Sequence, residues 1–538
     1  MSEHLQFTPF ERLLSLITKV RPGEGRTVGR FCGHVFLILF AYYIFRSVRE
    51  GLLLEHGTAA KGSYATAVIA GTLLILVPIY SAVRRRYDGA RLVNAVLAFF
   101  ATTLLGFWVA ATRDVDVGFA FYVWVGIFNV MILAQFWALA ADSFNVKTGQ
   151  RLFPVIMLAA HIGALTGAEF TDQLAQKLGT DNLLLVGFAL LLLTASFTKT
   201  MHDGVPEESR RLEETEARSP PSVFGGFEVV AKSRYLVLIA IMMVLINWIS
   251  STGDFIHRDF VKHHFGAIVA ADGGQSAKDL ITAYMGRFFF WMVILQLSIQ
   301  VLLVGRLFRW IGVAGALLLP AALSLIGYGL VGFVPLLTVI RAVRLGEQST
   351  QYSLTNTLRQ ALFLLTDRRS TYEGKTTIET FFWRFGDLLQ AGVVYAGLNW
   401  LHWSASQFAV LNLILAVLWI GLAVAIGREF VKMAREKVTN LAPVACKPID
   451  DLICEAGRAF RHVIPRDSFR DEDPGDVLRL RALLADGSPL PKWLRFNIRE
   501  CAFSGVFPSD LAADITVRVV ASDVDGMEAA SDFRIRQQ

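Results

Sequence analysis

The chain of 538 residues has few cysteines and few charged side chains. Its four cysteines, at positions 32, 446, 454 and 501, lack the paired spacing of a metal site, so we expect neither a zinc site nor a disulfide framework. Charged residues make up only 18% of the chain, against 54% hydrophobic residues and a mean hydropathy of +0.47. This composition excludes a soluble protein and predicts a polytopic membrane protein.

Sequence signatures of enzymes are also missing. Gly374-Lys375-Thr376 has the end of a phosphate-binding loop, but Arg369 stands where the loop needs glycine, which excludes an ATPase. His257, His263 and His264 are not spaced as metal ligands, and we expect them in a polar outer loop. We therefore predict no catalytic site, no metal and no cofactor. The net charge of +6 fits basic residues on one membrane side and indicates no nucleic-acid partner.

Hydrophobic runs predict an all-α membrane protein followed by a small β domain. With spans of about 20 residues, we expect twelve, at 32–54, 63–83, 92–111, 118–141, 152–175, 182–199, 234–256, 282–304, 311–332, 335–355, 376–400 and 406–428. Basic residues follow the even-numbered spans, and residues 1–31 are basic without a cleavage-like site. Both termini are therefore expected in the cytoplasm.

The two halves of the membrane region look like repeats. Basic, glycine-containing turns end the second and eighth spans, at 80–91 and 304–313. We expect a first six-helix half at 32–199, a cytoplasmic linker at 200–233 and a second half at 234–428. This is the major-facilitator plan, in which the solute binds near the midplane between the halves.

The first span carries three charges on one helical face. Arg46, Arg49 and Glu50 are spaced i, i+3 and i+4, and charges at bilayer depth usually face the interior of a bundle or a water-filled path. This makes the first span the leading candidate for a substrate site. The alternative is that these side chains reach from the helix end to the membrane interface.

Other charged positions complete the predicted site. Arginine and lysine suit an anionic solute, because they bind phosphate or carboxylate by charge-assisted hydrogen bonds. The expected substrate-binding residues are Arg46, Arg49, Glu50, Asp254, Arg341, Arg344, Arg359, Lys375 and Glu379. Gating or structural ion pairs are expected among Asp142, Arg151, Arg384 and Asp387.

Several stretches resemble the nucleotide transporter family, the ATP/ADP translocases of plastids and bacteria. Phe45-Arg-Ser-Val-Arg-Glu-Gly-Leu52 is similar to the family's first-span pattern, and Gln150-Arg-Leu-Phe-Pro-Val155 to its entry to the fifth span. Gln351-Tyr-Ser-Leu-Thr-Asn-Thr-Leu-Arg-Gln360 and Gly374-Lys-Thr-Thr-Ile-Glu379 resemble two later motifs. The resemblance covers roughly residues 30–430 and implies ATP:ADP antiport in a bacterial inner membrane.

Two positions depart from the family pattern. Gln360 replaces an expected glutamate, and Asp387 stands where plastid-type members have lysine. A basic residue replaced by an acidic one would work against binding several phosphates, so the departures affect the expected solute more than the fold.

The carboxy-terminal tail changes character. We expect a charged helix and linker at 429–473, then a β-sandwich-like domain at 474–538 with turns at Asp486-Gly487 and Asp525-Gly526. Leu490–Phe496 and Ala521–Gly526 resemble immunoglobulin-like and cadherin-like domains of bacterial surface proteins. Such a domain is usually a binding module, so a protein partner is expected for it.

The predicted function is transport of a nucleotide or another organic anion across a lipid bilayer by alternating access. A proton-coupled major-facilitator transporter of another solute is one alternative. The other is a membrane scaffold or sensor that docks a partner through its tail.

Overall fold

The computed structural model describes residue 18 and residues 24–84, 89–144, 146–202, 225–272, 276–367 and 369–438 of the helical part. In the tail it describes 442–465, 467–471, 477–498, 500–508, 514–523 and 526–537. The chain divides into two compact units, Met1–Val431 and Lys432–Gln538. The linker region 203–224 and the side chains of the basic turn at 84–91 lie outside the described residues.

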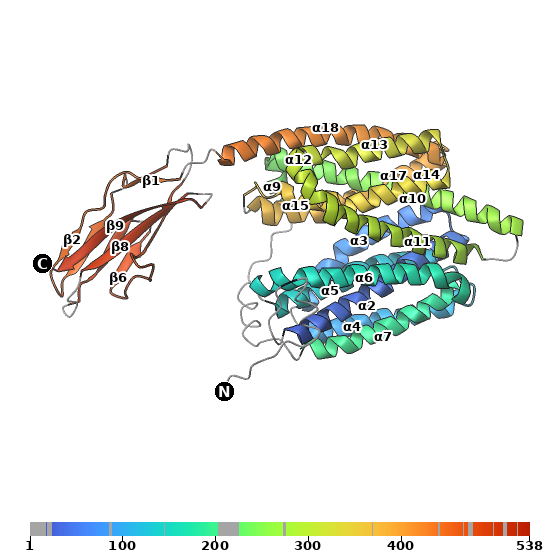
Figure 1. Ribbon diagram of the computed structural model, residues 1–538, viewed down its shortest axis with the longest axis horizontal. Coiled ribbons are helices and arrows are strands. Elements are labelled where there is room, and N and C mark those ends of the chain that lie inside the picture. The colour runs from blue at the N-terminus through green and yellow to red at the C-terminus, as the bar shows by residue number, and fades with distance from the viewer. Residues whose placement is uncertain are drawn as a thin grey trace. The chain divides into compact units, whose positions relative to one another are not determined.

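The first unit is a bundle of long helices that run side by side (Figure 1). Its first half consists of α2 (Gly25–His56), α3 (Ala59–Arg84), α4 (Gly89–Ala111), α5 (Gly118–Ser143), α6 (Val146–Leu178) and α7 (Thr180–His202). Its second half begins with α9 (Gly225–Lys232), α10 (Arg234–Asp272), α11 (Ala277–Ser298), the π-helical η1 (Ile299–Val304), α12 (Gly305–Ala316) and α13 (Leu318–Phe333). The predicted all-α bundle is confirmed.

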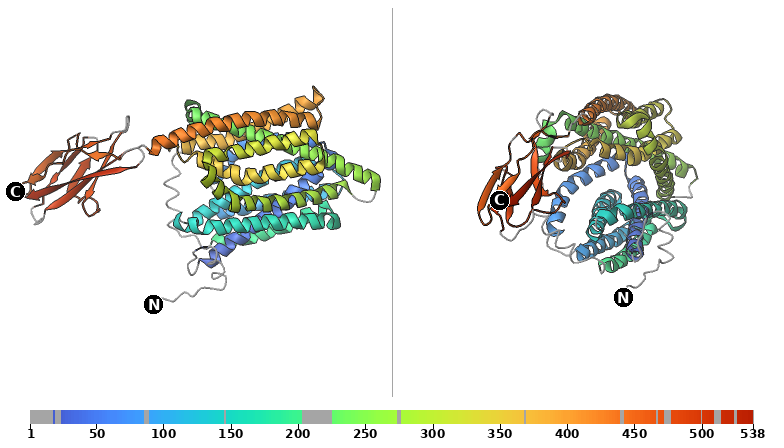
Figure 2. Two further views of the ribbon diagram at one scale, coloured as in Figure 1. Left: turned by 45° about the horizontal axis from the view of Figure 1, so that its top comes forward. Right: turned by 60° about the vertical axis from the view of Figure 1, so that its left-hand side comes forward.

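The last three helical stretches of the second half follow. The first joins α14 (Leu337–Thr350), η2 (Gln351–Thr355) and α15 (Asn356–Leu362). The second joins η3 (Ser370–Gly374), α16 (Lys375–Thr377), η4 (Ile378–Phe382) and α17 (Trp383–Asn399), and the third is α18 (Ala405–Val438). Figure 2 shows this bundle from two further directions.

Each of the twelve expected spans falls on a helical stretch. Among the described residues, nine helices are long and apolar enough to cross a membrane, and α13 is a shorter apolar helix. The stretches 337–362 and 370–399 are less apolar because they contain Arg341, Arg344, Lys375 and Arg384. These two stretches therefore carry five of the predicted binding residues, Arg341, Arg344, Arg359, Lys375 and Glu379.

Two helix ends differ from the sequence-based expectation. The span predicted to end at 256 continues as α10 to Asp272, so the prediction that His257, His263 and His264 lie in an outer loop is wrong. The span predicted to end at 304 continues until Gly312, whose φ of 67° breaks the helix. Only glycine adopts this backbone conformation without strain, so the turn forms there rather than at the preceding arginines.

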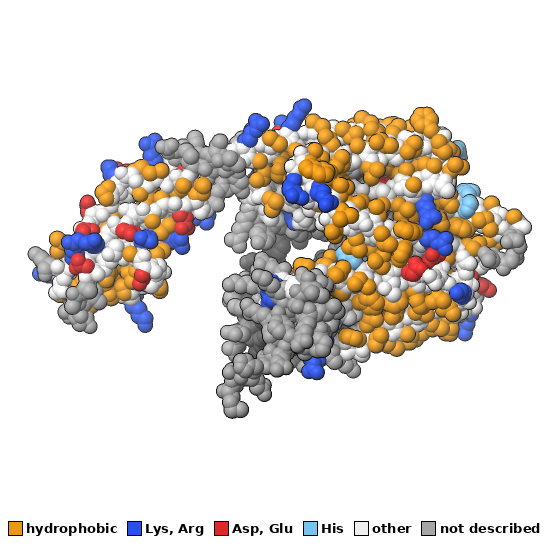
Figure 3. All heavy atoms as spheres, in the orientation of Figure 1, with side chains coloured by type: hydrophobic (Ala, Val, Ile, Leu, Met, Phe, Trp, Pro, Cys, Tyr) orange, Lys and Arg blue, Asp and Glu red, His pale blue; other side chains and the backbone are white. Residues whose placement is uncertain are grey.

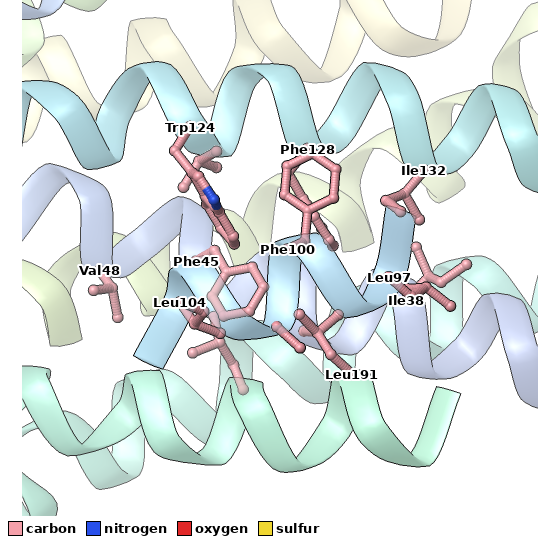
Figure 4. Close-up of a cluster of buried hydrophobic side chains, with 14 of the residues drawn as sticks. Ile38, Phe45, Val48, Leu97, Phe100, Leu104, Trp124, Phe128, Ile132 and Leu191 are labelled. Atoms are coloured by element: carbon pink, nitrogen blue, oxygen red, sulfur yellow. The ribbon is translucent and has the colours of Figure 1, made fainter. Parts of the chain in front are cut away.

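Aromatic packing holds the first half together. Phe45 of α2 lies 5.4 Å from Phe128 and 5.5 Å from Trp124 of α5, measured between ring centroids (Figure 4). Phe100 of α4 approaches the same two rings at 5.2 and 5.3 Å. Edge-to-face pairs of this kind are favoured, and in a bilayer close packing stabilises helix contacts more than apolar burial does.

Small residues bring α2 and α6 close together. Gly163 and Gly167 lie four residues apart on α6, where a Cβ atom would come within 2.9 Å of Phe36 Cα and 3.1 Å of Phe40 Cα, respectively. This spacing of glycines allows two membrane helices to approach closely.

The second unit is a small domain of two facing sheets. One sheet has the order β2-β9-β8-β5, formed by Leu452–Cys454, Glu528–Gln537, Ile515–Ser522 and Arg479–Leu484. The other has the order β3-β7-β6, formed by Ala459–Val463, Ala502–Val506 and Leu494–Asn497, and a short pair joins β1 (Val444–Ala445) to β4 (Phe469–Arg470). The predicted β domain is confirmed.

This domain includes residues that the sequence assigns to a linker. Strands β1 to β4 lie between 444 and 470, ahead of the expected start at 474. They were missed because they are two to five residues long and include exposed, charged positions. Buried residues of both sheets, including Phe503, Val519 and Phe533, form one core.

We expect Phe503→Ala to destabilise this domain by about 3–5 kcal/mol, because it leaves a cavity in the core where Phe503 is 0% exposed. The measurement is urea unfolding of a fragment covering residues 442–538. Ser504→Ala, at the exposed neighbouring position on β7, is the control. A loss below about 1 kcal/mol for Phe503→Ala would contradict the described core.

Candidate functional site

A buried arginine at the middle of the second half bonds to two carboxylates. Arg344 of α14 is 0% exposed; its Nη2 lies 2.6 Å from Oδ1 of Asp254 on α10, and its Nη1 lies 2.5 Å from Oε2 of Glu347. Tyr328 donates to the same Glu347 oxygen at 2.7 Å, and Gln348 donates to Asp254 at 2.8 Å. These bonds fix α10, α13 and α14 relative to one another.

Arg46 reaches this region from the first half. It is 7% exposed, and its Cζ lies 4.1 Å from the ring centroid of Phe289 on α11, 5.6 Å from Tyr43 and 5.9 Å from Tyr352 of η2. In the described part of the chain, no carboxylate forms an ion pair with Arg46, and its Nε has no hydrogen-bond partner.

A second pair of arginines meets at Tyr122 of α5. Arg49 lies over the Tyr122 ring at 4.2 Å, and its Nε is 3.3 Å from Oε1 of Glu50. Arg258, from α10 of the other half, donates to the Tyr122 hydroxyl at 3.2 Å and is 4% exposed. Tyr122 therefore contacts arginines from both halves.

Arg341 belongs to the same region. Its Cζ lies 5.5 Å from the ring of Tyr284, whose hydroxyl is 2.9 Å from Nε2 of His257. Over the residues that the structure describes, Arg341 forms no ion pair with a carboxylate.

These residues define what we call the central cluster. Its cations are Arg46, Arg49, Arg258, Arg341 and Arg344, and its carboxylates are Glu50, Asp254 and Glu347. The described cations outnumber the described carboxylates, although charge at bilayer depth is costly. The Asp254 side chain is 39% exposed, so the cluster adjoins an open space and is not sealed inside one half.

The remaining predicted binding residues form a second group away from the cluster. Arg359 of α15 lies 3.2 Å from Oε1 of Glu379 on η4, and Lys375 of α16 donates to Oε1 of Gln360. Arg359 follows Arg344 on the same helical stretch by about 20 Å, at 1.5 Å per residue. The single predicted site is therefore two separate groups.

The structure describes the side chains of three of the four residues predicted to form gating or structural ion pairs. Arg384 Nη1 lies 3.6 Å from Oδ2 of Asp387, and Ser251 of α10 donates to that carboxylate at 2.8 Å. Arg151 donates to Glu24 at 2.8 and 3.3 Å, which joins α6 to the residue that precedes α2. The side chain of Asp142 lies outside the described residues, so its pairing stays a prediction.

The two halves meet through a set of contacts that we call the seam, at the end of the bundle where α2 ends. Lys278 of α11 pairs with Asp181 at 2.9 Å and Glu55 at 3.4 Å, and Arg287 pairs with Asp172 at 2.8 Å. Gln390 donates to Ser63 at 3.0 Å. At the boundary of the halves near the opposite end, the surface is hollowed (Figure 3).

Three residues of this region, Arg258, Glu347 and Tyr352, are not among the predicted site residues. Arg258 was missed because α10 was expected to end at 256, although it lies one helical turn after Asp254 on the same face. Glu347 is three residues after Arg344, a spacing that indicates an ion pair. Tyr352 stands in a family-like motif but shows no charge pattern.

The chain is similar to curated carrier proteins. It is 22% identical over 515 residues to ADP,ATP carrier protein 1 of Chlamydia muridarum, which covers 81% of this chain and 94% of that protein. It is 21% identical over 522 residues to the protein of that name from Chlamydia trachomatis serovar D, covering 81% and 95%. The resemblance to ATP/ADP translocases is thus confirmed, and residues 442–537 match the family model "Putative Ig domain".

Solved structures with a similar fold are transporters of the major-facilitator type. The nucleoside transporter NupG aligns with a TM-score of 0.53 at 12% identity, over 76% of this chain and 99% of that one. A bacterial homolog of the human lysosomal transporter Spinster aligns with a TM-score of 0.51 at 11% identity, over 77% and 99%. The predicted major-facilitator fold is confirmed.

We expect Arg344→Gln to lower the stability of the purified protein far more than Arg46→Gln. Removing Arg344 leaves the buried Glu347 and the partly exposed Asp254 without their shared cation, and losing one partner of a buried ion pair costs about 3–5 kcal/mol. Arg46 has no such carboxylate partner among the described residues. Thermal unfolding in detergent is the measurement, and equal shifts for the two variants would contradict the described network.

Proposed function

We propose that this chain is a membrane transporter that moves an organic anion, with a nucleotide as the first candidate, by alternating access of its two halves. The observation that supports this most is the central cluster, where five described arginines face three described carboxylates. Arg46 and Arg341 would bind the anion directly, because neither is ion-paired within the described residues.

The physical chemistry of the cluster favours an anionic solute. Guanidinium groups bind phosphate and carboxylate through two parallel, charge-assisted hydrogen bonds. An excess of buried positive charge is costly in a membrane, and a bound anion would reduce that cost. The Phe289 and Tyr43 rings around Arg46 stabilise the cation in the empty site without forming a competing ion pair.

Similarity to the ADP,ATP carriers supports a nucleotide as the anion. The two departures from the family pattern do not weaken the central cluster. Asp387 is 3% exposed and bonded to Ser251 and Arg384, while Gln360 accepts a hydrogen bond from Lys375. Neither residue forms a described bond with an arginine of the cluster.

The second group of charges would form the entrance to the site. Arg359 and Lys375 outnumber Glu379 there, so a positive charge remains at the end of the bundle opposite the seam. Such a charge draws anions toward the hollow between the halves. If the amino terminus is cytoplasmic as predicted, this entrance faces the cytoplasm and the seam faces outward.

The seam would act as the gate on the closed side. Its contacts are ion pairs and hydrogen bonds near helix ends, which water replaces at low net cost when the halves separate. If the seam breaks while the opposite ends of the halves approach each other, the central cluster loses access to one side of the membrane and becomes accessible from the other. A bacterial inner membrane is the location that this function implies, and a protein partner of the tail remains a proposal.

The alternative of proton coupling would use carboxylates of the cluster. Asp254 and Glu347 share Arg344, so one of them could take up a proton during transport. In that case dissipating the proton gradient would stop uptake, whereas an exchange of nucleotides would continue.

We expect Arg46→Gln to lower uptake of labelled ADP into ATP-loaded proteoliposomes by about 10- to 100-fold, the range of one lost charged hydrogen bond or two. Arg309→Gln is the matched control, because Arg309 is exposed and bonds only to the Gly305 carbonyl among the described residues. Uptake by Arg46→Gln at the rate of the unchanged protein would refute this role.

We expect Gly62→Ala to open the seam. A Cβ atom on Gly62 would lie 2.6 Å from Cζ of Arg258, so the guanidinium group must shift and its bond to Tyr122 of the first half, a contact between the halves, is disturbed. Gly71→Ala on the same helix is the control, because nothing lies within 4 Å of its added carbon. The readout is labelling of a cysteine introduced as Thr282→Cys by a membrane-impermeant maleimide. Thr282 of α11 is buried and accepts a hydrogen bond from Thr180 of α7 across the halves, beside the seam.

After subtraction of the labelling seen in protein without the introduced cysteine, labelling should be several-fold higher with Gly62→Ala than without it. Gly71→Ala should leave the labelling unchanged. Unchanged labelling in both variants would show that the contact of Arg258 with α3 does not hold the gate closed.

A further inference from the structure

Tyr352 occupies an unusual position at the boundary of the two halves. It is 48% exposed, yet its ring centroid lies 5.9 Å from Cζ of Arg46, which belongs to the other half and is itself buried. A side chain so close to the opposite half faces the space between the halves and not the surrounding lipid. Tyr352 therefore lies beside Arg46 at the boundary between the halves.

Among the described residues, no aromatic ring packs against the ring of Tyr352. Around Arg46, the rings of Tyr43 and Phe289 contact each other at 6.1 Å and lie below the guanidinium group. Tyr352 forms no ring–ring contact and no side-chain hydrogen bond with any residue that the structure describes. Its aromatic face is thus available to a ligand.

The backbone around Tyr352 is held in place. It belongs to η2, a π-helical turn in the middle of the helical stretch 337–362, and such turns occur frequently at functional sites. Ser250 of α10 donates to the neighbouring Gln351 at 2.8 Å, and Ser353 donates to the Ser349 carbonyl at 2.6 Å. A fixed ring beside a buried cation is suited to recognising a flat group that carries a negative charge.

We propose that Tyr352 is the residue that selects for an aromatic ring in the transported anion. The ring of the solute stacks on Tyr352 while Arg46 binds the charged group, so the site takes an anion joined to a flat heterocycle, such as a nucleotide, in preference to the charged group alone. This inference rests on the proposed function, because it requires that the central cluster binds an anion.

The test compares two probes that share a diphosphate group but differ in the ring. Binding of ADP and of inorganic pyrophosphate to the full-length protein in detergent is measured by calorimetry. Stacking on an aromatic side chain contributes about 1–3 kcal/mol per base, so Tyr352→Ala should weaken ADP binding by about 10- to 100-fold and leave pyrophosphate binding within about twofold. Tyr352→Phe, which retains the ring, should preserve the preference for ADP.

Tyr395→Ala is the matched control, because Tyr395 on α17 is exposed to a similar extent but lies in contact with Tyr64 and Trp400. Equal weakening of both probes by Tyr352→Ala, or no effect on ADP, would overturn the proposal while leaving the anion site in place. If the unchanged protein binds neither probe, the proposed function itself fails, and the role of Tyr352 fails with it.

Discussion

The excess of positive charge between the two halves is the constraint on which the rest of the molecule depends. Guanidinium groups at bilayer depth are costly, and those of the central cluster are retained through three different arrangements. Arg344 is neutralised by Asp254 and Glu347, Arg49 pairs with Glu50, and Arg46 lies on aromatic rings. Only the last arrangement leaves the charge of the guanidinium group available to a bound solute.

Apolar packing holds the first half together, whereas ion pairs and hydrogen bonds form the seam between the halves. Inside the first half, rings such as Phe45 and Phe100 and the glycines of α6 pack closely. These contacts are apolar and do not compete with hydrogen bonds to water. Across the seam, Lys278 and Arg287 form ion pairs at partly exposed positions. Ion pairs of this kind contribute little net stability. In the proposed alternating access, closely packed halves with a weaker contact between them would rock without unfolding.

Much of the fold could be predicted from the sequence, because a bilayer requires long apolar helices and places basic residues on one side. Helix ends were predicted less well where polar residues continue a helix past the apolar run, as in α10 beyond residue 256. The early strands of the tail were missed because short strands with exposed charges give no alternating pattern. The hydrophobic pattern of a sequence predicts a helix or strand best where buried residues recur along its whole length.

The candidate site was predictable as a set of residues but not as a geometry. Charges at i, i+3 and i+4 identified Arg46, Arg49 and Glu50. Spacing along one helix cannot show, however, that Arg359 and Lys375 belong to a second group away from Arg344. Nor can charge patterns indicate Tyr352 or Tyr122, whose importance comes from the arginines that approach them from the opposite half.

This separation changes how the departures at Gln360 and Asp387 are to be interpreted. A loss of one carboxylate at 360 leaves Lys375 with a neutral partner and so makes the second group more positive. A carboxylate at 387 is bonded within the contact between α10 and α17, where Arg384 and Ser251 compensate it. Neither change adds negative charge beside Arg46. In the proposed function, binding of a phosphorylated solute would therefore depend on the central cluster, and the substituted motif positions would act on helix packing and on the approach to it.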